Sequence, residues 1–360
     1  MGRAAKIVAL NVCVFIGLFF AIMLIVSVSA DLVRIAKSVV GAGDSRGRDE
    51  LPMLAMDANA PRVFAEQRDT VSVYAPIVGW RKAPFRGEFV NIDENGLRTH
   101  TIGLDNSPSA KSIGFFGGST VWGTGVADNG TIPALFDSIT NDYAVTNFGE
   151  RGWRSRQSLA ELVNLYNQGK LPDVVVFYSG ANDVAIGCDL AFGPGYNETH
   201  ESPYLRELIG NRESSSYLYR NFVVPAWDTF QRLTKRQKVA SDRRCDVDPE
   251  RAHNVALTMF RNWQLAKLIT ESNGKKFYAF LQPVAGVGKP NISYLKLDQN
   301  ALDQYPPVYQ SVRSLIAAEG GGWAFDISDA FDGSNQYYID PLHVTDEGNA
   351  IIAKRILDRL

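Results

Sequence analysis

The sequence has few cysteines and histidines, and those it has are scattered. Its 360 residues include 3 cysteines and 4 histidines, with no C-x-x-C pair and no cluster that mixes the two. Three cysteines are too few for a disulfide scaffold, and their spacing offers no zinc site. We therefore expect a fold built on a hydrophobic core, without a bound metal.

The sequence also lacks an excess of charge of one sign and lacks nucleotide-binding motifs. Lys and Arg number 37 against 39 Asp and Glu, and no long basic run occurs, so nucleic acid is not an expected partner. Neither G-x-G-x-x-G nor G-x-x-x-x-G-K-[ST] is present, which argues against a nucleotide cofactor or phosphate cradle. We expect no cofactor. The remaining composition, 45% hydrophobic and 21% charged, is typical of a large globular domain.

One long apolar run does occur, at residues 7–30, directly after Arg3 and Lys6. As a helix it is long enough to cross a hydrocarbon core of ~30 Å. The basic residues before it favour a cytoplasmic N-terminus. We predict a single-pass signal anchor in the inner (cytoplasmic) membrane, with the rest of the chain on the periplasmic or extracellular side. A signal peptide cleaved after Val28-Ser29-Ala30 is the alternative.

Two segments separate this run from the main domain. Residues 31–70 show little periodicity and are predicted to be a linker or stalk, and their literal Gly43-Asp44-Ser45 has no strand before it or helix after it. Residues 71–110 alternate short segments with Pro and Gly turns, which predicts a small β-rich prelude. Within this prelude, Trp80, Arg81 and Arg98 either pack at an edge or face a substrate.

From residue 111 to residue 360, strand and helix patterns alternate, which predicts a parallel sheet covered by helices. The predicted strands are 113–116, 143–147, 174–178, 277–281 and 323–326, and the predicted helices are 155–168, 251–272, 302–318 and 345–360. Residues 183–250 interrupt the alternation and are predicted to be an insertion that shapes a substrate cleft. In an exported protein Cys188 and Cys245 can pair as a disulfide, and two buried free thiols are the alternative.

Residues 111–125, KSIGFFGGSTVWGTG, combine a buried-strand pattern with a tight turn. Gly117 and Gly118 permit a sharp turn and a close backbone approach. Ser119 then lies where a strand ends and a helix begins, the place where open α/β sheets bind their ligands. Ser119 is therefore either a nucleophile or a simple N-cap.

A serine nucleophile needs a base, a group that orients the base, and donors for the oxyanion. Asp340 precedes His343 by three residues after the last predicted strand, and Pro341 disfavours a helix there. The carboxylate can then turn back onto the imidazole and fix its tautomer.

Two other loops can supply oxyanion donors. Residues 179–183, SGAND, include Asn182 with its neutral side-chain amide, and residues 148–153, FGERGW, include Gly149 and Gly152, whose N–H groups are unobstructed. Each loop alone is typical of an ordinary turn. Four such loops at one edge of a sheet indicate an acyl-transfer site.

Taken in this order, Ser119, Gly152, Asn182 and His343 resemble the four blocks of the SGNH (GDSL-like) hydrolase family. G-x-N-D at residues 180–183 and D-x-x-H at residues 340–343 match its motifs. The first block differs from the family's motif, because residues 117–119 are Gly-Gly-Ser where the family has Gly-Asp-Ser. The missing acid is not a triad member, so catalysis is still expected.

The resemblance covers about residues 111–360 and implies a three-layer α/β/α flavodoxin-like fold with about five parallel strands. It implies Ser119 as nucleophile, His343 as base and Asp340 as its partner, with an oxyanion hole from the N–H groups of Ser119 and Gly152 and the Asn182 side chain. Gly152 is preferred to Gly149 because its distance from the preceding strand is that of family members.

The resemblance also implies a function, that of a serine esterase or deacylase. P-x-x-G-W at residues 76–80 looks like the prelude of membrane-anchored bacterial relatives that act on cell-surface polysaccharides. We therefore expect removal of acyl groups, acetyl in particular, from cell-surface carbohydrate. The partners would be an acylated polysaccharide, or another ester, and the membrane. The alternatives are an O-acyltransferase with the same triad and a catalytically silent carbohydrate-binding module.

Overall fold

The computed structural model describes residues 2, 7, 11, 14, 15, 17–19, 51, 54, 58–101, 109–189 and 244–360. Most of the predicted membrane-spanning run, the Gly43-Asp44-Ser45 triplet and residues 190–243 of the predicted insertion lie outside the described residues. In the part of the chain that is described, no helix has both the length and the apolar character of a membrane span. The residues described from 51 onward lie within one compact unit.

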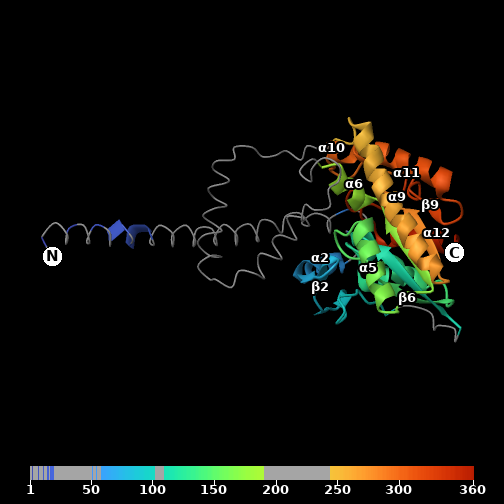
Figure 1. Cartoon of the computed structure of the whole chain (residues 1–360), viewed down its shortest axis with the longest axis horizontal. Coiled ribbons are helices and arrows are strands. Elements are labelled where there is room, and N and C mark those ends of the chain that lie inside the picture. The colour runs from blue at the N-terminus through green and yellow to red at the C-terminus, as the bar shows by residue number, and fades with distance from the viewer. Residues whose placement is uncertain are drawn as a thin grey trace. The chain divides into compact units, whose positions relative to one another are not determined.

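Five parallel strands form the central sheet (Figure 1). They are β5 (Lys111–Gly117), β6 (Tyr143–Asn147), β7 (Val174–Ser179), β8 (Lys276–Leu281) and β9 (Ala324–Asp326), arranged in the order β6-β5-β7-β8-β9. This order is the flavodoxin-like one, so the predicted α/β sheet is confirmed. Each strand overlaps its predicted run and differs from it by at most two residues at either end.

Helices cover both faces of the sheet and make the three layers. One face is covered by α5 (Ser155–Asn167), α6 (Ala181–Gly187), α9 (Pro249–Ser272) and α11 (Tyr305–Glu319), and the other by α4 (Ile132–Asp137) and α12 (Asp346–Leu357). Figure 1 shows α5, α9 and α11 together on one side. Short turns of helix complete the layers: α3 (Ser119–Trp122), η2 (Asp128–Gly130) and α10 (Gln299–Leu302).

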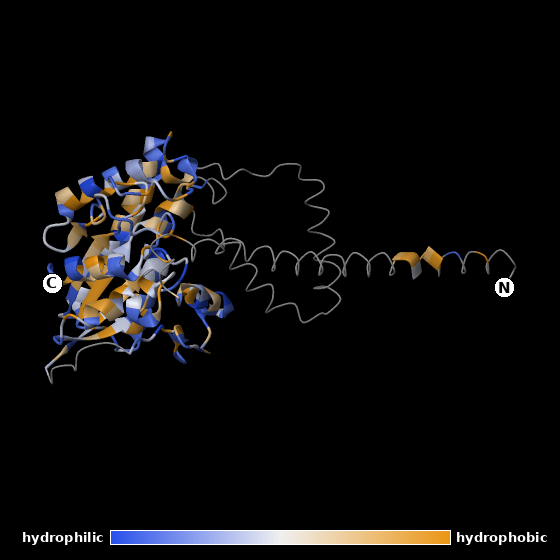
Figure 2. Cartoon of the chain, turned by 180° about the vertical axis from the view of Figure 1, so that it is seen from behind, coloured by the Kyte–Doolittle hydropathy of each residue, from blue (hydrophilic) through white to orange (hydrophobic). Residues whose placement is uncertain are grey.

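The central strands are apolar on both faces because each face has its own core. Along β5, Phe116 packs with the α5, α9 and α11 side, whereas Phe115 packs with the α4 and α12 side. Along β7, Phe177 packs with the α5, α9 and α11 side, and Val176 packs with the α4 and α12 side. Figure 2 shows the strands as mainly hydrophobic and the helices as mixed. A parallel sheet buried on both faces requires this nearly continuous apolar run, which is why the strands could be predicted from the sequence.

Some helical assignments differ from the prediction. The helix predicted at residues 302–318 begins three residues later, as α11, because Pro306 and Pro307 lack an N–H and are tolerated only in the first turn of a helix. The separate short helix α10 ends at Leu302. The short helix α4 was not predicted at all. It depends on a local cap, since the Thr131 hydroxyl accepts from the Ala134 N–H at 3.3 Å.

The segment before the sheet is more ordered than predicted. Residues 60–69, assigned to the linker, form helix α2 (Ala60–Asp69), which packs Phe64 against Ile339. Its stability therefore comes from a partner far away in the sequence, which periodicity does not reveal. The prelude is β-rich as predicted. It consists of two two-stranded antiparallel sheets, β1 (Ser72–Ala75) with β2 (Gly79–Lys82) and β3 (Phe85–Arg86) with β4 (Asn91–Ile92).

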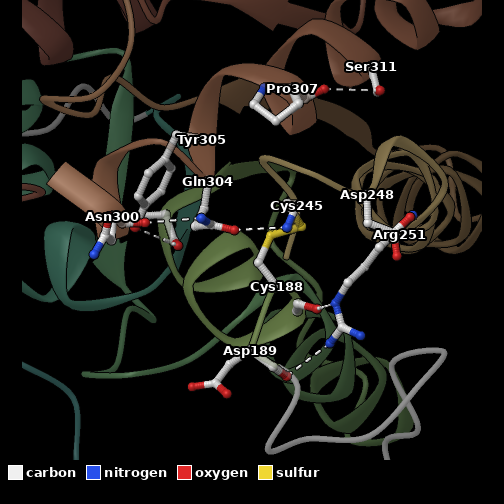
Figure 3. Close-up of a disulfide and its surroundings, with 12 residues drawn as sticks. Cys188, Asp189, Cys245, Asp248, Arg251, Asn300, Gln304, Tyr305, Pro307 and Ser311 are labelled. Carbon is white, nitrogen blue, oxygen red and sulfur yellow. Dashed lines mark hydrogen bonds between the residues drawn. A yellow bond between two sulfur atoms is a disulfide. The ribbon is translucent and has the colours of Figure 1, made fainter. Parts of the chain in front are cut away.

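A disulfide joins Cys188, at the end of α6, to Cys245, just before α9 (Figure 3). The Cys245 N–H donates to the Gln304 side-chain oxygen at 2.8 Å, and the Arg251 Nε donates to the Gly187 carbonyl at 3.0 Å. The predicted pairing is therefore confirmed. It links the two described stretches of chain that flank residues 190–243, which lie outside the described residues.

Replacing both cysteines, Cys188→Ala with Cys245→Ala, should lower stability by about 2–4 kcal/mol, because the bridge restricts the unfolded chain. The measurement is the Tm with and without reductant. Reductant should lower the Tm of the wild type and leave that of the double variant unchanged. Equal Tm values for the oxidised wild type and the double variant would contradict the prediction.

Candidate active site

The site begins at the turn between β5 and α3. Gly118 lies between the strand and the helix, and it, rather than Ser119, occupies the N-cap position. A Cβ on Gly117 would overlap the Tyr178 carbonyl oxygen, and one on Gly118 would lie 2.5 Å from the Asn182 side-chain nitrogen. Glycine at 117 therefore lets the backbone approach the Tyr178 carbonyl, and a side chain at 118 would require the Asn182 amide to move. The N-cap alternative for Ser119 is wrong, so its hydroxyl is available for another contact.

That contact is with His343. The Ser119 Oγ lies 2.7 Å from His343 Nε2, and His343 Nδ1 lies 2.7 Å from Asp340 Oδ2. The other carboxylate oxygen of Asp340 accepts the N–H groups of Leu342 and His343, each at 2.8 Å. These bonds fix the carboxylate, and the carboxylate in turn fixes the tautomer and orientation of the ring.

The side chains of His343 and Asp340 are only 12% and 9% exposed. Water therefore competes weakly for their hydrogen bond. The structure thus brings Ser119 together with two residues that lie more than two hundred positions further along the sequence.

Asn182 lies beside the turn at Gly118. It follows Gly180, whose φ of 137° only glycine adopts readily. The Asn182 Nδ2 donates to the Trp153 carbonyl at 2.8 Å, which leaves its second amide hydrogen for another acceptor. Asn182 therefore joins the first turn of α6 to the turn at residues 150–153.

The two candidate glycines of that region differ in their surroundings. The Gly149 N–H is already used, since it donates to the Asn147 side-chain oxygen at 2.9 Å, and a Cβ there would lie 2.7 Å from the Trp122 nitrogen. Gly152 has a φ of 80°, and a Cβ there would meet only the Trp80 ring, at an ordinary contact distance of 3.4 Å. Within the described residues, the N–H groups of Ser119 and Gly152 donate to no protein acceptor. This favours Gly152 over Gly149 as a donor to a ligand.

Two buried carboxyl groups near the site support its loops. Asp183 accepts the Ser155 hydroxyl at 2.6 Å and the Ser155 N–H at 3.2 Å, which anchors the start of α5. Glu150 accepts the N–H groups of Lys82 and Arg151 at 2.8 and 2.7 Å. Burial raises the pKa of both carboxyl groups. Their oxygens are occupied by protein donors, so they hold structure and do not face a substrate.

The prelude residues pack against the site. Arg98 is buried, pairs with Asp128 at 2.8 Å, and donates to the carbonyls of Gly123 and Val126 at 2.5 and 2.7 Å. Its contacts brace the chain that leaves α3, so the edge-packing interpretation is correct for Arg98. Arg81 pairs with Glu161 at 2.6 Å and is also buried.

A water-sized cavity lies beside His343. Its walls are formed by Thr120, Thr124, Tyr178, Phe331, Leu342, His343, Val344 and Asn349. Within the part of the chain that the structure describes, the buried hydroxyls of Thr120 and Thr124 have no hydrogen-bond partner. The cavity is too small for an acyl chain or a sugar. Among the residues that the structure describes, no group of Cys, His, Asp and Glu is arranged to hold a metal ion.

Comparison with known proteins adds a family match. The model of the family described as GDSL-like Lipase/Acylhydrolase matches residues 113–356. No curated protein matches the sequence significantly.

Several solved structures are similar at low identity. One is a member of the lipolytic protein G-D-S-L family from Veillonella parvula, with 14% identity over 69% of this chain and 97% of that one and a TM-score of 0.39. Another is a carbohydrate acetylesterase from Sinorhizobium meliloti, with 12% identity over 69% and 97% and a TM-score of 0.39. A third is the M. smegmatis aryl esterase, with 14% identity over 70% and 100% and a TM-score of 0.35.

Replacing Arg98 by Met should lower the free energy of unfolding by about 3–5 kcal/mol, because it leaves the Asp128 charge buried without its partner. Arg62→Met is the matched control. Arg62 also pairs with a carboxylate, that of Glu88, and lies 4.8 Å from the Phe89 ring, as Arg98 lies 4.6 Å from the Trp122 ring.

The Arg62 pair, however, is exposed, and losing it should cost about 0–1 kcal/mol. Urea unfolding followed by circular dichroism measures both losses. A loss for Arg98→Met no larger than that for Arg62→Met would show that burial of the pair is not decisive.

Proposed function

The chain belongs to the GDSL-like lipase/acylhydrolase family and is an ester-bond hydrolase. From this premise we propose that it is a serine esterase that removes acyl groups, acetyl in particular, from cell-surface carbohydrate. The observation that carries the proposal is the continuous hydrogen-bonded series from Ser119 through His343 to Asp340.

In the first half of the reaction, His343 Nε2 takes the proton of Ser119 as the Oγ attacks the ester carbonyl. The new Oγ–C bond forms a tetrahedral intermediate, which collapses as the bond to the sugar oxygen breaks. His343 returns the proton to that oxygen, and the sugar leaves as an alcohol. Asp340 stabilises the charged imidazole throughout.

In the second half, water replaces the sugar. His343 takes a proton from water, whose oxygen attacks the acyl carbon, and the Ser119–acyl bond breaks as the proton returns to Ser119 Oγ. The products are the carboxylic acid and the free enzyme. A sugar hydroxyl in place of water would transfer the acyl group instead, with the same residues.

Both halves build negative charge on the carbonyl oxygen. The proposed donors to this oxyanion are the N–H groups of Ser119 and Gly152 and the Asn182 side chain. Two observations support the assignment: these backbone N–H groups have no acceptor within the described residues, and Asn182 has one amide hydrogen left.

The proposed substrate and location rest on the N-terminal part of the chain. The P-x-x-G-W segment resembles that of membrane-anchored relatives that act on polysaccharide. The apolar run at residues 7–30 would anchor the chain in the inner membrane, with the catalytic domain on the periplasmic or extracellular side. The Cys188–Cys245 disulfide supports an oxidising compartment of this kind.

The test is hydrolysis of a small acetyl ester and of an acetylated polysaccharide by the full-length chain. Ser119→Ala should abolish the release of acetate from both. Including an acceptor carbohydrate separates hydrolysis from transfer, since transfer yields a newly acetylated sugar and no acetate. Full acetate release by Ser119→Ala would sink the proposal, and a protein that binds the polysaccharide without any turnover would instead be a binding module.

Asn182→Ala should lower kcat about 10²–10³-fold on the small acetyl ester, the usual cost of losing one oxyanion donor. Asn262→Ala is the control, because the Asn262 amide donates to Ser155 Oγ at 3.0 Å and lies outside the proposed oxyanion hole. It should keep near-normal kcat. Equal kcat values for the two variants would remove Asn182 from the oxyanion hole.

A further inference from the structure

Strand β2 of the prelude is bonded to the turn that carries Gly152. The Trp80 Nε1 donates to the Arg151 carbonyl at 2.8 Å. In the other direction, the Trp153 Nε1 donates to the Trp80 carbonyl at 3.2 Å. The Lys82 N–H donates to the Glu150 carboxylate at 2.8 Å. Three hydrogen bonds thus hold residues 150–153 against one short strand.

The first of these bonds acts on the Gly152 N–H itself. The Arg151 carbonyl and the Gly152 N–H belong to the same peptide group, which is planar and trans. Holding the carbonyl oxygen toward Trp80 therefore points the N–H to the opposite side. A hydrogen bond to the oxygen also polarises the peptide group and strengthens its N–H as a donor.

Close packing fixes Trp80 against the turn that carries Gly152. Its side chain is buried, and its Cζ2 lies 3.4 Å from where a Cβ on Gly152 would be. Gly152 itself has a φ of 80°, a conformation that most residues avoid. On its other side the turn is tied to Asn182, which donates to the Trp153 carbonyl at 2.8 Å. Both assigned donors of this region therefore depend on the placement of one turn.

We propose that Trp80 is a positioning residue for the oxyanion hole: through its hydrogen bond to the Arg151 carbonyl it sets the direction of the Gly152 N–H. The inference rests on the proposed function, because it needs Gly152 to serve an oxyanion. Trp80 lies outside the residues matched by the family model, 113–356. The prelude is therefore part of the catalytic apparatus, although the family pattern does not include it.

The test is Trp80→Phe in the full-length chain, which keeps an aromatic ring and removes only the donor. The expected result is a fall in kcat of about 10- to 100-fold on a small acetyl ester, the scale of a misplaced catalytic group. KM and the shape of the pH–rate profile should stay unchanged, because the donor that is removed bonds the Arg151 carbonyl and not a residue of the triad.

Trp323→Phe is the matched control. Trp323 is about as buried as Trp80, and its Nε1 also donates to a backbone carbonyl, that of Glu319, at 3.0 Å. It lies between α11 and β9, away from the turn. A purely structural cost would lower the Tm of both variants alike and leave kcat near that of the wild type.

A second measurement does not depend on activity. In protein labelled with ¹⁵N-glycine, the amide signal of Gly152, identified by its absence in Gly152→Ala, should shift in Trp80→Phe and stay in place in Trp323→Phe. A kcat for Trp80→Phe equal to that of Trp323→Phe, or a Gly152 signal that does not move, would overturn the positioning role.

Ser119→Ala is run in the same assay to separate the two claims. Its inactivity together with an unchanged kcat for Trp80→Phe would overturn the positioning role alone. Its full activity would overturn the proposed function and this inference with it.

Discussion

The close backbone approach at Gly117 and Gly118 is the constraint on which the site depends. A Cβ on Gly117 would overlap the Tyr178 carbonyl oxygen, and one on Gly118 would displace the Asn182 amide from its present place. With glycine there, the ends of β5 and β7 and the turn at residues 150–153 meet within hydrogen-bonding distance of one another. The parallel sheet makes this possible, because its register aligns the carboxyl ends of the strands, with Gly117 opposite Tyr178. The chemistry is thus a consequence of packing at a sheet edge.

Residues of the N-terminal segment form hydrogen bonds that hold the chain directly after α3. Gln67 on α2 donates to the carbonyls of Gly123 and Val126 at 3.0 and 2.8 Å and accepts the Gly125 N–H at 2.9 Å. Together with Arg98, it bonds the backbone that leaves α3, so the C-terminal end of the helix that presents Ser119 is held in place. Losing these buried contacts would leave polar backbone groups unpaired, which is costly. A chain without α2 and the prelude would keep the triad residues and lose this support.

Much of the fold and of the candidate site could be predicted from the sequence, and the features that could not be predicted share a physical cause. The five strands are recognisable because burial on both faces makes them apolar, and Asp340 and His343 are recognisable because they are three residues apart. Helix α2 and the contacts of Trp80 are not recognisable. They depend on partners about seventy or more positions away, such as Arg151 for Trp80, and no local pattern records that pairing. The Ser119 N-cap alternative was also undecidable from the sequence, because only the backbone geometry, with Gly118 at the N-cap position, excludes it.

The central claim is that Ser119 is an activated nucleophile, and covalent labelling tests it most directly. A serine-directed fluorophosphonate, applied to the full-length chain and followed by peptide mass spectrometry, should give one adduct on the peptide that contains Ser119. The adduct should be absent in Ser119→Ala and much slower to form in His343→Ala, because the base is lost. Labelling that persists in Ser119→Ala, or that forms equally fast without His343, would contradict the account.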